Sequence, residues 1–81
     1  MTDEKTFLLI ETAVGCKEEV WDALTQCPHV SSADWVTGPY DIVAVVKQED
    51  AQAIRQRLSG LALARGGLIR IVTCPIARQA T

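Results

Sequence analysis

The stretch Thr37-Gly38-Pro39-Tyr40-Asp41, followed directly by Ile42-Val43-Ala44-Val45-Val46, decides the fold of this chain. It joins a polar turn that carries a carboxylate to a strand that is apolar at every position. Side chains of a strand alternate between the two faces of a sheet, so this strand must be shielded from water on both faces. The rest of the chain supplies enough helix to cover one face. We therefore expect a partner to cover the other.

Size and composition point in the same direction. The chain has 81 residues, of which 48% are hydrophobic. We predict a single domain over residues 1–81, with an ordered core from about residue 6 to residue 77. A chain this short buries only about 60% of its extended surface on folding. Its apolar residues exceed what one small core can hold, and this indicates self-association.

Charge and cysteine content exclude several classes of protein. The net charge is −2 and the arginines are scattered among acidic residues, a pattern that disfavours direct nucleic-acid binding. The three cysteines, Cys16, Cys27 and Cys74, form no closely spaced metal-binding pair, and their odd number disfavours a disulfide framework. The charged start lacks a signal core, and no apolar run approaches the ~20 residues that span a membrane. We predict a cytoplasmic protein without metal or other cofactor.

Hydrophobic periodicity predicts four strands and two helices. The strands are expected at residues 7–12, 30–36, 40–47 and 68–76, and the helices from about 18 to 27 and from 49 to about 61. Gly38-Pro39 predicts a tight, two-residue hairpin turn, and Ser59-Gly60 and then Gly66-Gly67 predict a loosening of the chain. Pro75 removes one ladder hydrogen bond and places the end of the last strand at an edge or bulge. Residues 78–81 are predicted to fray.

The resulting order, βαββαβ, predicts an α+β, ferredoxin-like fold with both helices on one face of an antiparallel sheet. Three of the strands carry aliphatic side chains on both faces. Two sheets packed face to face would bury the uncovered sides, so we predict a homodimer at least. Arg70 lies in an otherwise apolar strand and needs a partner, and Glu11 across the two-fold interface is a candidate.

Two segments of this pattern also resemble a known family. The turn Thr37-Gly38-Pro39-Tyr40-Asp41-Ile42, together with Gly15-Cys16-Lys17-Glu18-Glu19-Val20 at the first helix, is similar to the effector-binding (RAM) domain of Lrp/AsnC transcription regulators. The resemblance covers about residues 7 to 76 and is to the stand-alone form without the DNA-binding half. It implies a dimeric αβ sandwich or barrel that assembles further into rings of dimers, as an octamer or decamer. It also implies mixed assemblies with full-length regulators.

In such domains a small amino acid or related metabolite binds between dimers. The resemblance places the ligand contacts here at Thr37, Gly38, Tyr40 and Asp41, and we include Pro39 in the site as the residue that shapes the turn. It adds, more weakly, two residues of the last strand, Thr73 and Cys74, where this chain departs from the family pattern. No catalytic residue and no direct contact with nucleic acid or membrane is implied.

The turn also has a ligand-binding chemistry of its own. Asp41 can accept charge-assisted hydrogen bonds from the ammonium of an amino acid, and backbone amides around Gly38 can meet the carboxylate. Tyr40 can form a wall or donate its hydroxyl, whereas Pro39 has no N–H and shapes the turn. The alternative is a purely structural turn, because Gly, Pro and Asp are all good turn formers.

Two other functions remain open at this point. A small cofactor-free oxygenase or isomerase on a dimeric αβ barrel would need a proton-transfer group in an enclosed pocket. His29, the one histidine of the chain, is the candidate, and its position after Pro28 predicts a solvated loop instead. An ACT-like amino-acid-binding domain shares the βαββαβ order and would hold its ligand beside the first helix. We favour a non-enzymatic effector-binding and oligomerisation module that modulates transcription regulators.

Overall fold

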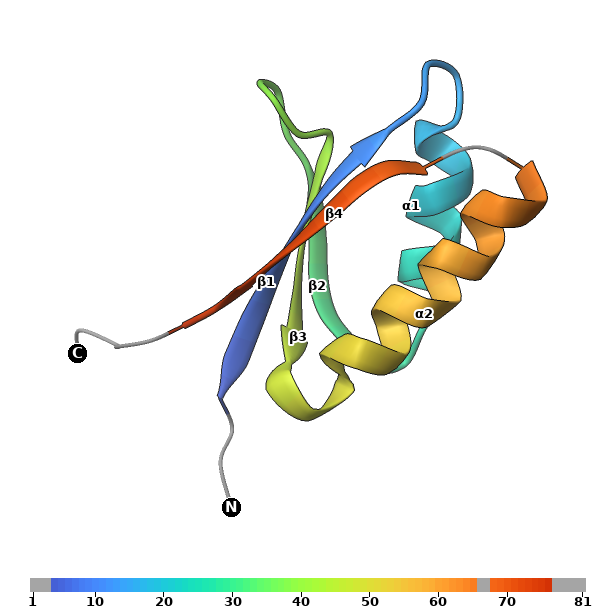
Figure 1. Ribbon diagram of the computed structural model, residues 1–81. Coiled ribbons are helices and arrows are strands. Elements are labelled where there is room, and N and C mark those ends of the chain that lie inside the picture. Colours follow the sequence, from blue (N-terminus) through green and yellow to red (C-terminus); the bar gives the residue numbers. More distant parts are fainter. Residues whose placement is uncertain (1–3, 66–67, 77–81) are drawn as a thin grey trace.

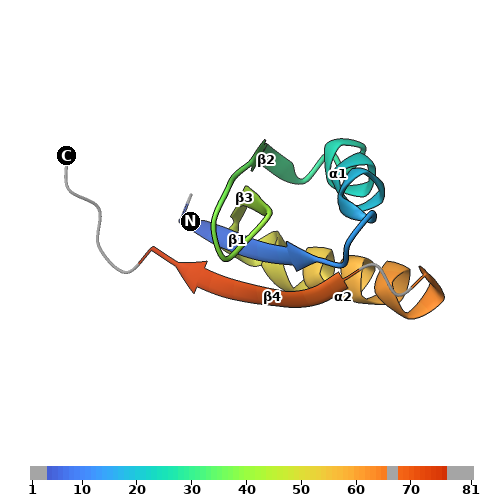
Figure 2. The ribbon, with the colours of Figure 1, turned by 90° about the horizontal axis from the view of Figure 1, so that it is seen from above.

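The computed structural model describes residues 4–65 and 68–76. Its elements follow the predicted βαββαβ order (Figure 1): β1 (Lys5–Thr12), α1 (Lys17–Thr25), β2 (Val30–Trp35), β3 (Ile42–Lys47), α2 (Gln48–Arg65) and β4 (Leu68–Pro75). The four strands form one antiparallel sheet in the order β2-β3-β1-β4. Both helices pack on the same face of this sheet, as Figures 1 and 2 show from two directions. The predicted α+β, ferredoxin-like fold is confirmed.

The core lies between this sheet and the two helices. The register pairs Leu8 with Ala44 and Ile10 with Ile42, so alternate residues of the two central strands point toward the helices. Ala51, Ile54 and Leu58 of α2 meet them at helical spacing. The buried apolar side chains are Leu8, Ile10, Val20, Leu24, Cys27, Ile42, Ala44, Val46, Ala51, Ile54 and Leu58. Cys27 is thus a core residue, as its place in the predicted helical stripe indicates.

Helix α2 differs from the sequence prediction. We expected the chain to loosen at Ser59-Gly60, but α2 continues through both residues to Arg65. A glycine inside a helix costs only about 1 kcal/mol relative to alanine. The burial of Ala51, Ile54 and Leu58 against the sheet outweighs that cost. The predicted flexible pair Gly66-Gly67 and the predicted frayed tail lie outside the described residues.

The two edge strands, β2 and β4, each depart from regular pairing. Pro75 lies opposite Thr6 at the end of β4, which pairs only with β1, so the predicted edge position is confirmed. Strand β2 has a register shift between Val30 and Ser32 where it pairs with β3. Near the other end of β2, Trp35 meets Trp21 of α1 edge to face, with ring centroids 5.8 Å apart. This contact ties α1 to the sheet edge.

Candidate functional site

The β2–β3 loop is a four-residue connection rather than the predicted two-residue turn. Trp35 pairs with Ile42, and the Val36 N–H donates to the Asp41 carbonyl at 2.9 Å, so the chain reverses over residues 37–40. The Asp41 N–H also donates to the Ile10 carbonyl of β1 at 2.8 Å. These two hydrogen bonds fix the backbone of Asp41 to Val36 and to β1, so the chain has completed its reversal by residue 41. Gly38 has φ +124°, a conformation that disfavours any side chain at this position.

The Asp41 carboxylate fastens this loop to the end of β1. Its Oδ2 accepts hydrogen bonds from the Thr12 N–H at 2.8 Å and from the Thr12 Oγ1 hydroxyl at 3.2 Å. Thr12 is buried and Asp41 is half-buried. Hydrogen bonds to a carboxylate are stronger than those between neutral groups. Both bonds reach the same oxygen, so Oδ1 is the oxygen that remains for another donor.

Arg70 joins this loop to β4. Its Nη2 lies 3.3 Å from Glu11 Oε1 on the neighbouring strand, and its Cζ lies 5.2 Å from the centre of the Tyr40 ring. The pair Glu11–Arg70 is formed within one chain, because the two residues are opposite one another in the β1–β4 register. The expected pairing across a two-fold interface is therefore wrong. The structure places a cation, a carboxylate and an aromatic ring at one corner of the sheet.

Sequence reasoning considered Glu11 as a partner of Arg70 but missed Arg70 as a member of the site. The available signal was an isolated charge near the start of an apolar strand. Only the register shows that this position meets Glu11 within the sheet, beside the residue Thr12 that holds Asp41. The corner therefore combines Glu11, Tyr40, Asp41 and Arg70 from three separate segments of the chain.

The other predicted site residues, Thr73 and Cys74, lie elsewhere in the sheet. They pair with Leu8 and Phe7, three to four positions along β1 from Glu11. Thr73 faces the helices, where its hydroxyl accepts a hydrogen bond from Arg55 Nη1. Cys74 points to the opposite face, because successive side chains of a strand alternate. Within one chain, these two residues are not brought together with the loop.

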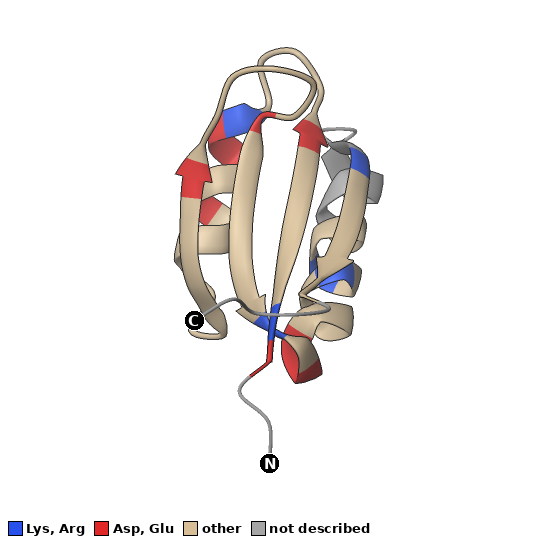
Figure 3. Ribbon diagram, turned by 90° about the vertical axis from the view of Figure 1, so that its left-hand side faces the viewer, with Lys and Arg blue, Asp and Glu red and all other residues tan. Residues whose placement is uncertain are grey.

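The face of the sheet away from the helices, which we call the open face, is apolar along β1, β3 and β4 between charged ends, whereas β2 contributes Ser32 and Asp34 to it. Figure 3 shows the charged positions of its strands gathered toward the strand ends, with uncharged segments between them. Phe7 is 37% exposed although it is aromatic. The other apolar residues of the open face on β1, β3 and β4 are only half-buried: Leu9, Val43, Val45, Val72 and Cys74. Tyr40 and Asp41 lie in the loop at one end of this face.

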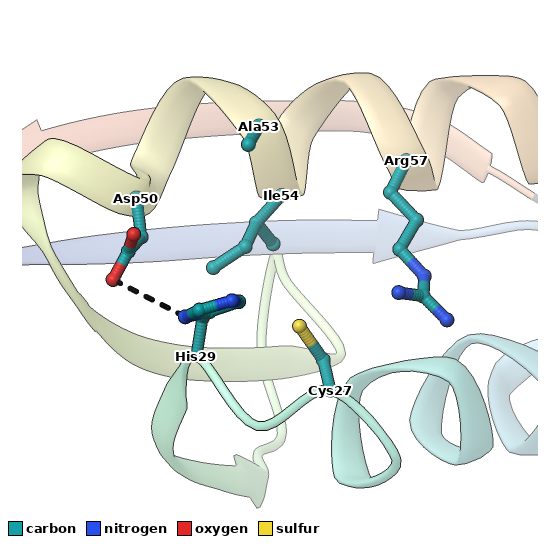
Figure 4. A pocket seen from close by; sticks show the side chains of 6 residues that line it. All are labelled: Cys27, His29, Asp50, Ala53, Ile54 and Arg57. Atoms are coloured by element: carbon teal, nitrogen blue, oxygen red, sulfur yellow. Dashed lines mark ion pairs between the residues drawn. The ribbon is translucent and has the colours of Figure 1, made fainter.

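His29 lines a separate pocket on the helix side. His29 Nδ1 lies 3.8 Å from Asp50 Oδ2, and the pocket between them and Arg57 has a volume of about 160 Å³ (Figure 4). The His29 side chain is 64% exposed, so it is a surface residue rather than the enclosed base that the enzymatic alternative requires. Across residues 4–65 and 68–76, no three His, Cys, Asp or Glu side chains are arranged to hold a metal ion. No helix in the same ranges has the length and apolarity to cross a bilayer.

No protein-family model matches this chain, and no curated protein matches it by sequence. Solved structures do match. The protein TTHA0845 from Thermus thermophilus is 27% identical, with a TM-score of 0.75, and the alignment covers 96% of this chain and 98% of that one. The transcriptional regulator NMB0573 of Neisseria meningitidis, solved in complex with L-Met, is 15% identical with a TM-score of 0.73. AsnC of E. coli is 18% identical with a TM-score of 0.73.

The two regulators are longer than this chain. The alignments cover 96% and 98% of this chain but only 52% of NMB0573 and 54% of AsnC. The chain therefore corresponds in fold to about half of each regulator and to almost the whole of TTHA0845. The βαββαβ fold of this chain is therefore shared with both regulators, as the Lrp/AsnC resemblance implied.

Proposed function

We propose that this chain is a non-enzymatic, Lrp/AsnC-type effector-binding and oligomerisation module. It dimerises through the open face, binds a small amino acid at the 37–41 loop, and couples that binding to further assembly with other dimers or with full-length regulators. The observation that carries the proposal is the corner at the end of the sheet, where Thr12 holds Asp41 and Arg70 lies over the ring of the preceding residue, Tyr40. The shared fold with two transcription regulators favours this function over the enzymatic alternatives.

The apolar open face supports dimerisation. Three strands, β1, β3 and β4, about 4.8 Å apart and some six residues long, present an apolar face of about 300 Å². The largest apolar patch on a typical monomer is about 300–600 Å², and such a patch is often functional. Phe7 and its half-buried neighbours gain roughly 25 cal/mol for each Å² of apolar surface removed from water. A second copy of the same face, turned by a two-fold axis, matches this surface in shape and apolarity.

The corner supplies both charges that an α-amino acid needs. Asp41 is fixed by Thr12 through Oδ2, so Oδ1 can accept the ligand ammonium without a rearrangement of the loop. The carboxylate of the ligand can then bind the backbone amides around Gly38 or the guanidinium of Arg70 above the Tyr40 ring. Glu11 competes with the ligand for Arg70, so a bound carboxylate must displace or share that ion pair.

Ligand binding changes assembly only when the ligand binds one assembly state more tightly than another. Each tenfold difference in affinity between the two states contributes about 1.4 kcal/mol to the shift. A loop that lies at the rim of the dimer face and is tied to β1 can transmit this difference, because a neighbouring dimer would contact the ligand itself.

The test is native mass spectrometry of the purified protein with a panel of amino acids. Asp41→Asn keeps an acceptor for the Thr12 N–H and removes the negative charge that receives the ammonium. We expect the variant to remain dimeric and to lose about tenfold in affinity for the best amino acid, a change of about 1.4 kcal/mol. Asp22→Asn is the matched control, because Asp22 is an exposed carboxylate on α1, on the helix side of the sheet, and should leave binding unchanged.

Two results would contradict the proposal in different ways. A protein that stays monomeric and retains no amino acid removes the function altogether. If the Asp41→Asn dimer binds an amino acid as well as the wild type does, the chain is still an effector module. Its ligand then lies away from the loop, as the ACT-like alternative expects.

A further inference from the structure

The pocket around His29 is a second candidate site, well separated from the loop. His29 precedes Val30, which pairs with Val46 at one end of the β2–β3 hairpin, whereas the 37–41 loop joins the two strands at the other end. Figure 1 shows the loop and the start of α2 at opposite ends of the molecule. A ligand in this pocket therefore would not touch the loop in the same chain.

Two elements form the walls of the pocket. Helix α2 contributes Asp50, Ala53, Ile54 and Arg57, whose spacing places them on one side of the helix. The segment between α1 and β2 contributes Cys27 and His29. Ile54 is 3% exposed and Cys27 is 7% exposed, so the floor is apolar and belongs to the core.

The polar groups stand at the two ends of this apolar floor. At one end, His29 Nδ1 faces Asp50 Oδ2 at 3.8 Å, which leaves Nε2 as the ring nitrogen available to a ligand. At the other end is the guanidinium of Arg57, and Figure 4 shows the Cys27 sulfur between the two. Among the side chains that the structure describes, Arg57 has no ion-pair partner, whereas Asp50 has His29.

From this arrangement we propose that the pocket binds a small carboxylate with a short apolar chain. The carboxylate pairs with Arg57, the chain lies over Ile54 and Cys27, and its far end reaches the His29 ring. Arginine is the side chain best suited to this contact, since its planar fork matches both carboxylate oxygens. Asp50 lies beside the His29 ring at that end of the pocket.

The volume limits the size of the ligand. A pocket of about 160 Å³ holds the equivalent of about five water molecules, each with a share of about 30 Å³ in the liquid. A carboxylate with a chain of three or four carbons fits this space. Such a site suits a metabolite of the size of a short fatty acid or small keto acid.

The experiment uses the full chain labelled with ¹⁵N and titrated with butyrate. We expect saturable shifts of the backbone amide signals of Cys27, His29 and Ala53 at millimolar butyrate. Butyramide, which has the same shape without the charge, should produce no such shifts.

Substitutions locate the binding group. Arg57→Gln should weaken butyrate binding by about tenfold, and Arg57→Lys should restore part of it, since lysine keeps the charge without the fork. Lys47→Gln is the matched control: Lys47 is an exposed cation outside the pocket and its loss changes the net charge equally. Asp41→Asn should leave butyrate binding unchanged, which separates this site from the proposed effector site.

Three outcomes would overturn the inference. Wild-type protein that shows no saturable shift with butyrate has no such site. Equal binding by wild type and Arg57→Gln removes the carboxylate contact. Inorganic phosphate that binds more tightly than butyrate at the same residues would assign the pocket to a different class of anion.

Discussion

The two faces of the central strands carry similar apolar residues, but only the face toward the helices is buried. On the helix side Leu8, Ile10, Ile42, Ala44 and Val46 are all 0% exposed, whereas Phe7 on the open face is 37% exposed. These two sets alternate along the same strands, so propensity and hydrophobicity do not distinguish them. The difference lies in the covering layer. The helices α1 and α2 cover one face of the sheet, and no element in the described part of the chain covers the other. Burial is therefore a property of the neighbouring element as much as of the residue itself.

The largest expected effect compares two adjacent leucines of β1. Leu8→Ala removes a fully buried side chain from the core and should lower the free energy of unfolding by about 2–5 kcal/mol at any protein concentration. Leu9→Ala removes a half-buried side chain of the open face, so its cost should depend on protein concentration, as expected for a residue that contributes through association. Urea unfolding at two widely separated concentrations measures both. A Leu9→Ala cost that is independent of concentration would break the comparison.

The next effect concerns association alone. Val45→Glu places a charge in the middle of the open face, and burial of an unpaired charge is strongly unfavourable. We expect the dissociation constant of the dimer to rise at least about 100-fold, equivalent to about 2.7 kcal/mol. The folded monomer should keep its far-UV circular dichroism. Light scattering after size-exclusion chromatography gives the mass. Gln52→Glu, on the exposed side of α2, adds the same charge elsewhere and should leave the dimer intact.

The smallest effect sharpens the comparison on the helix side. Thr6 is fully buried there, and its Oγ1 hydroxyl has no hydrogen-bond partner among the described residues. An unsatisfied buried hydroxyl is costly, and valine has nearly the same shape without it. Thr6→Val should therefore raise the free energy of unfolding by about 1 kcal/mol, as measured by thermal or urea unfolding. A loss of stability would indicate that the hydroxyl has a role that the single chain does not reveal.

Much of the fold could be predicted from the sequence because the relevant signals are local. The apolar run at residues 42–46, the helical stripe of Ala51, Ile54 and Leu58, and the proline at position 75 each determine their own element. The continuation of α2 through Gly60 could not be predicted, because it depends on tertiary burial of the preceding turns. Local propensity favoured a break at that point, and the packing of α2 against the sheet prevailed.

The candidate site was less accessible to sequence reasoning. The loop residues stood out through their turn chemistry, but the contact of Asp41 with Thr12 joins positions 29 residues apart. The contacts of Arg70 with Glu11 and Tyr40 likewise depend on strand register. A shift of the register by one residue would abolish these contacts. The length of the loop was also mispredicted, since the pairing of Asp41 with β1 decides where the reversal occurs.

The irregularities at the two outer strands have a consequence for how copies of this chain can join. Unpaired strand margins invite further strands and, with them, fibrous aggregates. Here the proline at the end of β4 cannot donate a hydrogen bond to an added strand, and the register shift near the start of β2 interrupts its outward row of donors and acceptors. Addition of further strands is thus disfavoured at both edges, which leaves the open face as the surface through which the proposed assembly would form.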